Sequence, residues 1–223
     1  DSQGHAALMF AMAPRDDLYA WLAGGADPFP LMRNVPREKW AVEAIGEGSL
    51  VLLASSTRTA LIPIEQPEDE LLMRKRVQEL AGAFDTIVID TAPSTSALDA
   101  LVYLTPESFL CVVEPEALAV AGLRDTVNQI TAFAGLRERL GLPAQRIRGV
   151  IPNKLRTRTN LHWDYLSHMT HDLGLPLWPH INLRKHWAEA TTYGRLVYTY
   201  APKSDAAEDA RELLIWIQET RHA

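Results

Sequence analysis

An acidic residue, Asp90, directly follows a short apolar run in the stretch FDTIVIDTAPS, residues 84–94. The run Thr86–Ile89 is uninterrupted and rich in β-branched residues, which is typical of a strand buried on both faces of a parallel sheet. Open α/β sheets bind their ligands at the carboxyl ends of the strands, where this acid would lie. The pattern makes Asp90 a candidate ligand-binding carboxylate; the alternative is a buried strand that simply meets water at an acid.

Basic residues gather in the C-terminal part of the chain. Residues 144–203 contain nine Lys and Arg but only three Asp and Glu, although the whole chain has a net charge of −6. For the basic pair Arg184 and Lys185, only Glu189 is available as an acidic partner at helical spacing. A basic face on an acidic protein favours a polyanionic partner, and a merely solvated face is the alternative. The clusters are Lys154, Arg156 and Arg158, then Arg184 and Lys185.

The elements that would position these residues alternate between strands and helices. Strands are predicted at 49–55, 85–90, 108–115 and 147–153. Helices are predicted within 68–84, around 97–104, through Leu123–Ala134, over 160–173 before Gly174, and from the N-cap Ser204 onward. The last helix is expected to bury Ala206, Ala210, Leu213, Leu214 and Ile217. This alternation predicts an α/β fold with a doubly wound, mostly parallel sheet and helices on both faces.

The bulk composition fits one globular domain. The 223 residues are 47% hydrophobic, which is enough for one sizeable core, so 1–223 is interpreted as a single domain. Neither a membrane-length apolar stretch nor a signal peptide is recognised, which favours a soluble cytoplasmic protein. Cys111 is the only cysteine and lies in the apolar run SFLCVV, so it is expected to be a small core residue.

Several stretches, taken in order, resemble one family. FDTIVIDTAPSTSALDALVYL resembles the Walker B region of the ParA/MinD/Soj family of deviant P-loop ATPases. CVVEPEALAVAGLRDTV and GVIPNKLRTRT resemble the next two strand regions, and INLRKHWAEATTYGRLVYTYAPKSDAAEDARELL resembles the C-terminal block. The first residues, DSQGH, resemble the end of the family's DxDPQG element, with Ser2 in place of proline. The resemblance rests on order and spacing, and it is weakest between about residues 10 and 50.

The resemblance implies roles for individual residues. Asp1 matches the second acid of DxDPQG, which positions the attacking water, and a frayed terminal residue is its alternative. Asp90 matches the Walker B acid, which holds Mg²⁺ through water. Asn153 matches a position that binds the adenine edge, although a turn residue after a strand would need no such role. Four positions match basic surface residues that bind DNA without sequence preference: Arg156, Arg158, Arg184 and Lys185.

The family's signature loop is missing from the sequence. Such a glycine-rich loop cradles phosphates with backbone amides and a lysine, but no G-x-x-x-x-G-K-[ST] occurs in the 223 residues. Two alternatives follow: the natural chain carries a strand and a P-loop upstream of Asp1, or the protein is a degenerate relative that cannot hold a triphosphate in the usual way. The expectation is a ParA-like ATPase domain that lacks its N-terminal strand and P-loop.

The function that the resemblance implies is that of a ParA-type partitioning ATPase. Such a protein uses ATP and Mg²⁺, forms a homodimer on ATP binding, and coats nucleoid DNA. A centromere-binding partner of the ParB type stimulates hydrolysis, and the cycle moves plasmids or chromosomes. The alternative is a nucleotide-independent DNA-binding or scaffold relative. A MinD-like membrane regulator is disfavoured, because the ending LLIWIQETRHA is not a basic amphipathic tail.

Overall fold

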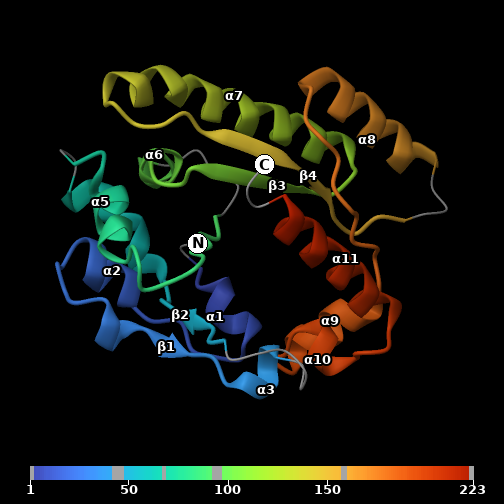
Figure 1. Ribbon diagram of the computed structural model, residues 1–223, viewed down its shortest axis with the longest axis horizontal. Coiled ribbons are helices and arrows are strands. Elements are labelled where there is room, and N and C mark those ends of the chain that lie inside the picture. The colour runs from blue at the N-terminus through green and yellow to red at the C-terminus, as the bar shows by residue number, and fades with distance from the viewer. Residues whose placement is uncertain (1–2, 42–47, 67–68, 92–96, 157–159, 221–223) are drawn as a thin grey trace. The chain divides into compact units, whose positions relative to one another are not determined.

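The computed structural model describes residues 3–41, 48–66, 69–91, 97–156 and 160–220 (Figure 1). The contacts between residues divide the chain into two compact units. Unit 1 comprises Asp1–Pro106 and Ala190–Tyr200, and unit 2 comprises Glu107–Glu189 and Ala201–Ala223. The sequence predicts a single domain, and each unit is described by itself. None of the described helices combines the length and the apolar character that crossing a membrane requires.

Unit 1 is built mainly from short helices around one core. Trp21, Leu22 and Ile62 are almost fully buried there and pack with Leu72 and Met73. In chain order its elements are α1 (His5–Met9), α2 (Asp17–Leu22), η1 (Phe29–Leu31), β1 (Arg33–Asn34), α3 (Arg37–Trp40), β2 (Val51–Leu52), η2 (Thr57–Leu61), α4 (Ile62–Glu65), α5 (Leu72–Glu79), α6 (Ala97–Leu104) and α10 (Val197–Tyr200). The predicted helix around 97–104 is therefore confirmed.

The predicted first strand is shorter than expected and runs antiparallel to its neighbour. The sequence predicts a parallel strand at 49–55, whereas β2 pairs antiparallel with β1. The reason is that the Gly- and Pro-rich segment 24–40 returns beside it, and Val35 N–H donates to the Leu50 carbonyl at 2.9 Å. An adjacent segment of the chain thus supplies the pairing.

The segment 85–90, predicted as a buried parallel strand, is not a strand in the structure. The Val88 side chain is 85% exposed and Ile87 is 40% exposed. Among the described residues no strand pairs with this segment. A β-branched run forms a regular strand only where a neighbour satisfies its backbone N–H and C=O groups, which is the physical reason for the difference.

Unit 2 contains two parallel strands, and an extended segment around residues 176–178 pairs with the outer edge of the second strand. Its elements are β3 (Ser108–Val113), α7 (Ala117–Arg139), β4 (Arg146–Pro152), α8 (Asn160–Leu173), α9 (Lys185–Thr192, which ends in unit 1) and α11 (Asp205–Glu219). β3 and β4 are parallel, with Ser108 opposite Arg146 and Val113 opposite Pro152. Along the other edge of β4, Trp178 N–H donates to the Val150 carbonyl and Val150 N–H donates to the Pro176 carbonyl, each at 2.9 Å.

Helices cover both faces of this pair of strands, with α7 and α8 on one side and α11 on the other (Figure 1). On the first face, Val113 and Val150 pack with Leu123 of α7 and Leu166 of α8. On the second face, Ile151 packs with Leu213 and Ile217 of α11, together with Trp178 and Ile181. The predicted α/β architecture is therefore confirmed, and the predicted helix over 160–173 has the same bounds in the structure.

Two details of the predicted core can be checked in unit 2. Ser204 caps α11 as predicted, because its Oγ accepts the Ala207 N–H at 3.2 Å. Leu214 is 42% exposed rather than buried, since it lies outside the face of α11 that contacts Trp178 and Ile181. Cys111 is partly buried in β3, and this burial raises the pKa of its thiol to about 11.

Candidate functional site

The carboxyl ends of β3 and β4 bring three polar residues together. Glu114 directly follows β3, and Asn153 and Lys154 directly follow β4. The Asn153 backbone N–H donates to the Val113 carbonyl at 2.7 Å, which continues the parallel pairing beyond β4. The Lys154 ammonium forms an ion pair with the Glu114 carboxylate, so the two strand ends are joined by backbone and by side chain.

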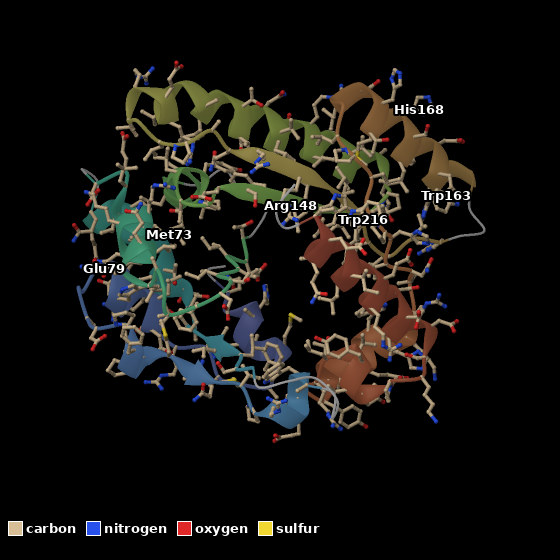
Figure 2. The ribbon with its side chains drawn as sticks, viewed as in Figure 1. Met73, Glu79, Arg148, Trp163, His168 and Trp216 are labelled. Carbon is tan, nitrogen blue, oxygen red and sulfur yellow. The ribbon has the colours of Figure 1, made fainter. Side chains whose placement is uncertain are left out.

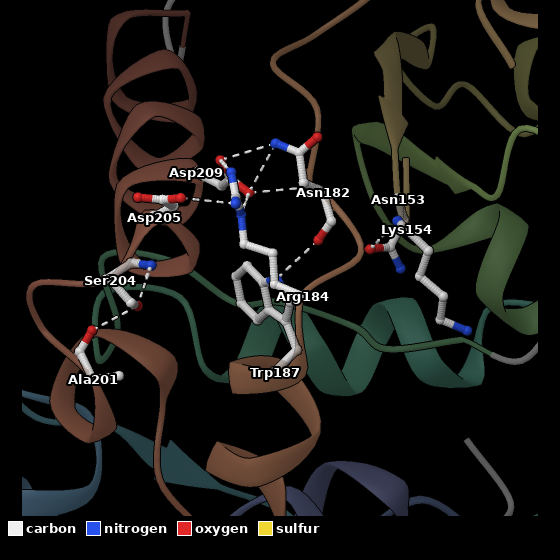
Figure 3. Close-up of polar contacts among 10 residues, drawn as sticks. Asn153, Lys154, Asn182, Arg184, Trp187, Ala201, Ser204, Asp205 and Asp209 are labelled. Atoms are coloured by element: carbon white, nitrogen blue, oxygen red, sulfur yellow. Dashed lines mark hydrogen bonds and ion pairs between the residues drawn. The ribbon is translucent and has the colours of Figure 1, made fainter. Parts of the chain in front are cut away.

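The turn after β4 has an unusual backbone. Lys154 has a φ of 52°, in the left-handed region that residues other than glycine rarely adopt. Its backbone N–H donates to Oδ1 of Asn153 at 3.0 Å (Figure 3). An asparagine side chain that bonds to the backbone in this way stabilises a tight turn. The turn therefore also fixes the direction of the Asn153 amide.

A close approach of two segments supports β4 from its other edge. Gly149 has a φ of 154°, and a Cβ at this position would lie 2.3 Å from Nε1 of Trp178. The Trp178 indole N–H donates to the Arg148 carbonyl at 3.0 Å, and the Arg148 guanidinium lies 5.3 Å from the Trp178 ring centroid. Only glycine allows this approach, so Gly149 positions the segment along β4.

The predicted DNA-binding residue Arg184 is held by two acids of α11 (Figure 3). Its Nε bonds to Asp209 at 3.1 Å and its Nη1 bonds to Asp205 at 2.9 Å. The hydrogen bond to Asp209 raises the pKa of Arg184, and Asn182 donates to the same carboxylate at 3.1 Å. The lack of an acid near Arg184 in the sequence therefore does not leave its charge unneutralised, because its partners lie more than twenty residues away along the chain.

The other predicted basic contacts differ in how far acids neutralise them. The Lys185 ammonium lies 3.6 Å from Glu189, but its side chain is 76% exposed. Arg156 is exposed, and its backbone N–H donates to Nδ1 of His162 at 3.3 Å. No ion pair is found for the Arg156 guanidinium among the described residues. Arg158 lies in 157–159, outside the described residues.

Of the two predicted catalytic and metal-binding acids, only Asp90 is described, and it lies in unit 1. Asp90 is exposed, and it is the last residue of the segment 85–90, which forms no strand. Asp1 lies outside the described residues. Asn153 and the described basic residues Arg156, Arg184 and Lys185 belong to unit 2. Unit 2 thus contains the described residues of the base-binding and DNA-binding predictions, and the roles of these residues and of the two acids stay predictions.

No compact cluster of metal ligands occurs in the described part of the chain, where no group of three or more His, Cys, Asp or Glu could hold an ion. His168, on α8 (Figure 2), lies close to the backbone carbonyl of Asp164, with Nδ1 2.7 Å from its oxygen. A Mg²⁺ bound mainly through phosphate oxygens and water needs few protein carboxylates, so Asp90 alone fits such an ion.

Sequence reasoning missed the residues that hold the site. Glu114 comes directly after β3, so the rule that singled out Asp90 at a strand end also applies to it. Asp205 and Asp209 are spaced four apart on α11, which places both carboxylates on one helix face. The spacing alone does not reveal which arginine they meet.

Comparisons with known proteins place this geometry in context. A family model described as an AAA domain matches residues 48–140. Protein IncC of Escherichia coli is 27% identical over 128 residues, which is 57% of this chain and 34% of IncC. The chain therefore spans about a third of the length of that curated relative.

Solved structures match nearly the whole chain. Apo McdA of Cyanothece has a TM-score of 0.77 at 15% identity and covers 96% of this chain and 84% of its own. A putative plasmid partition protein of Borrelia burgdorferi bound to AMPPNP has a TM-score of 0.69 at 17% identity, with 98% and 84% covered. These matches confirm the resemblance predicted from the sequence: the chain is similar to ParA/MinD-family proteins, and it shares the P-loop NTPase fold of its solved structural neighbours.

Proposed function

We propose that this chain functions as a ParA-type partitioning ATPase. It binds ATP with Mg²⁺, forms a homodimer on ATP binding, and associates with nucleoid DNA without sequence preference. A centromere-binding partner of the ParB type stimulates hydrolysis, and the cycle segregates a plasmid or a chromosome. The fold shared with partition proteins supports the proposal.

The observation that carries the nucleotide part of the proposal is the Asn153 amide at the end of β4. Its Oδ1 faces the Lys154 N–H, and among the described residues its Nδ2 has no hydrogen-bond acceptor. An amide with one outward donor and a second oxygen lone pair fits the edge of a purine base. Its place at the carboxyl end of parallel strands is the usual place for a ligand in this class of sheet.

The acids of unit 1 take the other proposed roles. Asp90 holds Mg²⁺ through water, and Asp1 positions the attacking water molecule. The bound Mg²⁺ supplies charge neutralisation for the phosphate oxygens. The exposure of Asp90 is compatible with access to a hydrated ion.

The DNA-binding part of the proposal rests on exposed basic side chains; among those that the structure describes, only Lys185 pairs with a nearby carboxylate, that of Glu189 at 3.6 Å. Arg156 has no acidic partner among the described residues, and Lys185 is mostly exposed. Arg184 is assigned a smaller contribution, because a phosphate would have to compete with Asp205 and Asp209. Arg158 is included on the basis of sequence alone.

Asp90→Ala tests the ATPase. We expect loss of ATP turnover, because the variant removes the carboxylate that orders the ion's water ligands. Asp125→Ala, which changes an exposed acid on α7, is the matched control and should keep the wild-type rate. ATP turnover by the Asp90→Ala variant at the wild-type rate would contradict the assignment.

Binding to DNA at two salt concentrations tests the basic residues. Removing one side chain that binds a phosphate should reduce the slope of log affinity against log salt by about 0.9. Replacing Arg156, Arg158 and Lys185 by Gln should therefore flatten the slope more than replacing Arg184 alone. If the triple variant binds DNA like the wild type at both salts, these residues form only a solvated face.

A second candidate function is a nucleotide-independent DNA-binding scaffold. One observation favours it: the segment 85–90, which ends at Asp90, forms no strand, and Val88 within it is 85% exposed. Mobility shifts with and without ATP separate the two candidates. The ATPase requires stronger DNA binding with ATP, whereas the scaffold binds DNA equally in both conditions.

A further inference from the structure

The turn at the end of β4 adopts a conformation that needs support from outside itself. Lys154 has a side chain, so its φ of 52° is disfavoured. Two interactions oppose this cost: its N–H bonds to Oδ1 of Asn153 at 3.0 Å, and its ammonium pairs with Glu114 beyond β3. Disfavoured backbone conformations that surrounding interactions maintain are often found at functional sites. The conformation of Lys154 therefore bears on the role of the adjacent Asn153.

The neighbour whose orientation depends on this turn is Asn153. A backbone N–H can only donate, so the amide oxygen of Asn153 must face Lys154 and the amide nitrogen must point elsewhere. Without the bond to Lys154, rotation about the terminal torsion of Asn153 would interchange its donor and its acceptor. The turn therefore selects one of two orientations of the amide.

The selected orientation distinguishes between purines. Adenine presents an amino donor beside a ring-nitrogen acceptor, which matches an amide that accepts through Oδ1 and donates through Nδ2. Guanine presents an oxygen in place of that amino group, and this oxygen would face the Oδ1 lone pair of Asn153. An amide free to rotate would lose much of this discrimination.

The Glu114–Lys154 pair is better suited to a local role than to stabilising the fold. The Lys154 and Glu114 side chains are 54% and 42% exposed. Ion pairs this exposed contribute little to the free energy of unfolding. Lys154 is also engaged here rather than in the basic cluster to which the sequence assigns it.

We propose that Glu114 and Lys154 are positioning residues that hold the Asn153 amide in the orientation selecting adenine over guanine. The proposal rests on the proposed nucleotide-binding function, which it deepens by assigning base selectivity to the pair. It predicts that weakening the pair changes the ratio of the ATP and GTP dissociation constants more than it changes stability.

The test uses Glu114→Gln, which removes the charge and keeps the shape of the side chain. ATP and GTP affinities are measured by competition against a fluorescent ATP analogue with Mg²⁺, and thermal melting checks that the variant is folded. We expect the preference for ATP to fall about tenfold, within the range of one well-oriented amide–base contact. Asp172→Asn is the matched control, because the Arg124–Asp172 pair is similarly exposed (57% and 52%) and should leave the preference unchanged.

A second substitution provides a rescue. Lys154→Gly added to Glu114→Gln should restore most of the preference, because glycine adopts the positive φ without support and keeps the N–H that faces Asn153. A structural role alone would not predict this recovery.

The outcomes separate this inference from the function on which it rests. A wild-type chain that binds ATP, with a preference unaffected by Glu114→Gln, overturns the role of the pair and leaves the proposed function standing. A wild-type chain that binds neither nucleotide overturns both.

Discussion

The segments Thr86–Ile89 and Ser108–Val113 are both short apolar runs rich in β-branched residues or leucine, yet they have different structures. The second is β3, with β4 paired in parallel and helices packed on both faces. The first forms no strand, and Val88 is 85% exposed whereas Val113 is 5% exposed. The comparison shows that an apolar run specifies a strand only together with a neighbour that satisfies its backbone groups.

The largest expected effect tests how unit 2 supplies such a neighbour along β4. Gly149→Ala places a Cβ against the Trp178 indole and forces an alanine to a φ of 154°. We expect the free energy of unfolding to fall by about 3 kcal/mol, measured by denaturant unfolding.

The matched control is Gly135→Ala in α7, where an added Cβ meets no atom within 4 Å. This substitution should raise stability by about 0.5–1 kcal/mol, because alanine is the better helix former. If both variants change stability alike, the close approach of Trp178 to Gly149 does not support the strand.

A thiol probe measures the burial of the two runs directly. In β3, burial raises the pKa of Cys111 to about 11, so near pH 8.5 its reactive thiolate is scarce. A cysteine introduced at Val88 in a Cys111→Ser background should titrate near the ordinary value for a thiol. We expect alkylation of the introduced thiol to be about 100-fold faster near pH 8.5.

The pH dependence of stability follows from the same shift. The folded state keeps the Cys111 proton that the unfolded state loses, so this contribution to stability is present below the ordinary thiol pKa. It is lost as the pH rises from about 8.5 toward 11. Cys111→Ser should reduce the loss of stability across this window.

In the alkylation experiment, equal rates for Cys111 and for the cysteine introduced at Val88 would show that Ser108–Val113 and Thr86–Ile89 are equally buried.

The smallest expected difference comes from shortening one valine in each run. Val113→Ala removes buried methyl groups and should cost about 2 kcal/mol of unfolding free energy. Val88→Ala removes exposed ones and should change stability by less than about 0.5 kcal/mol. A cost at Val88 as large as that at Val113 would mean that Thr86–Ile89 is packed as a strand in solution.

The sequence predicts local elements well where their signals are local. The helix over 160–173 ends before Gly174, which has a φ of 62°, and Ser204 caps α11 as its side chain leads one to expect. That the segment 85–90 forms no strand could not be foreseen from its own residues, because strand pairing depends on a strand elsewhere in the chain. For the same reason, the exposure of Leu214 is decided by which face of α11 meets the sheet.

The candidate site shows the same division. Asn153 is recognisable at the end of a predicted strand, and its neighbour Lys154 is a basic residue in the sequence. Neither the left-handed backbone of Lys154 nor its pairing with Glu114, forty residues earlier, has a sequence signal of its own. The two acids that hold Arg184 come from a helix that follows it in the chain, so charge counting within 144–203 overstates the free basic charge.

The most direct test of the central claim, that the end of β4 binds the base of ATP, is a calorimetric titration of the wild type and Asn153→Ala with Mg²⁺ and ATP. The account predicts that the wild type binds ATP and that the variant binds it at least about tenfold more weakly, because a base-facing amide has been removed. Equal ATP affinity in the two proteins would contradict the assignment of Asn153 and of the strand end that holds it.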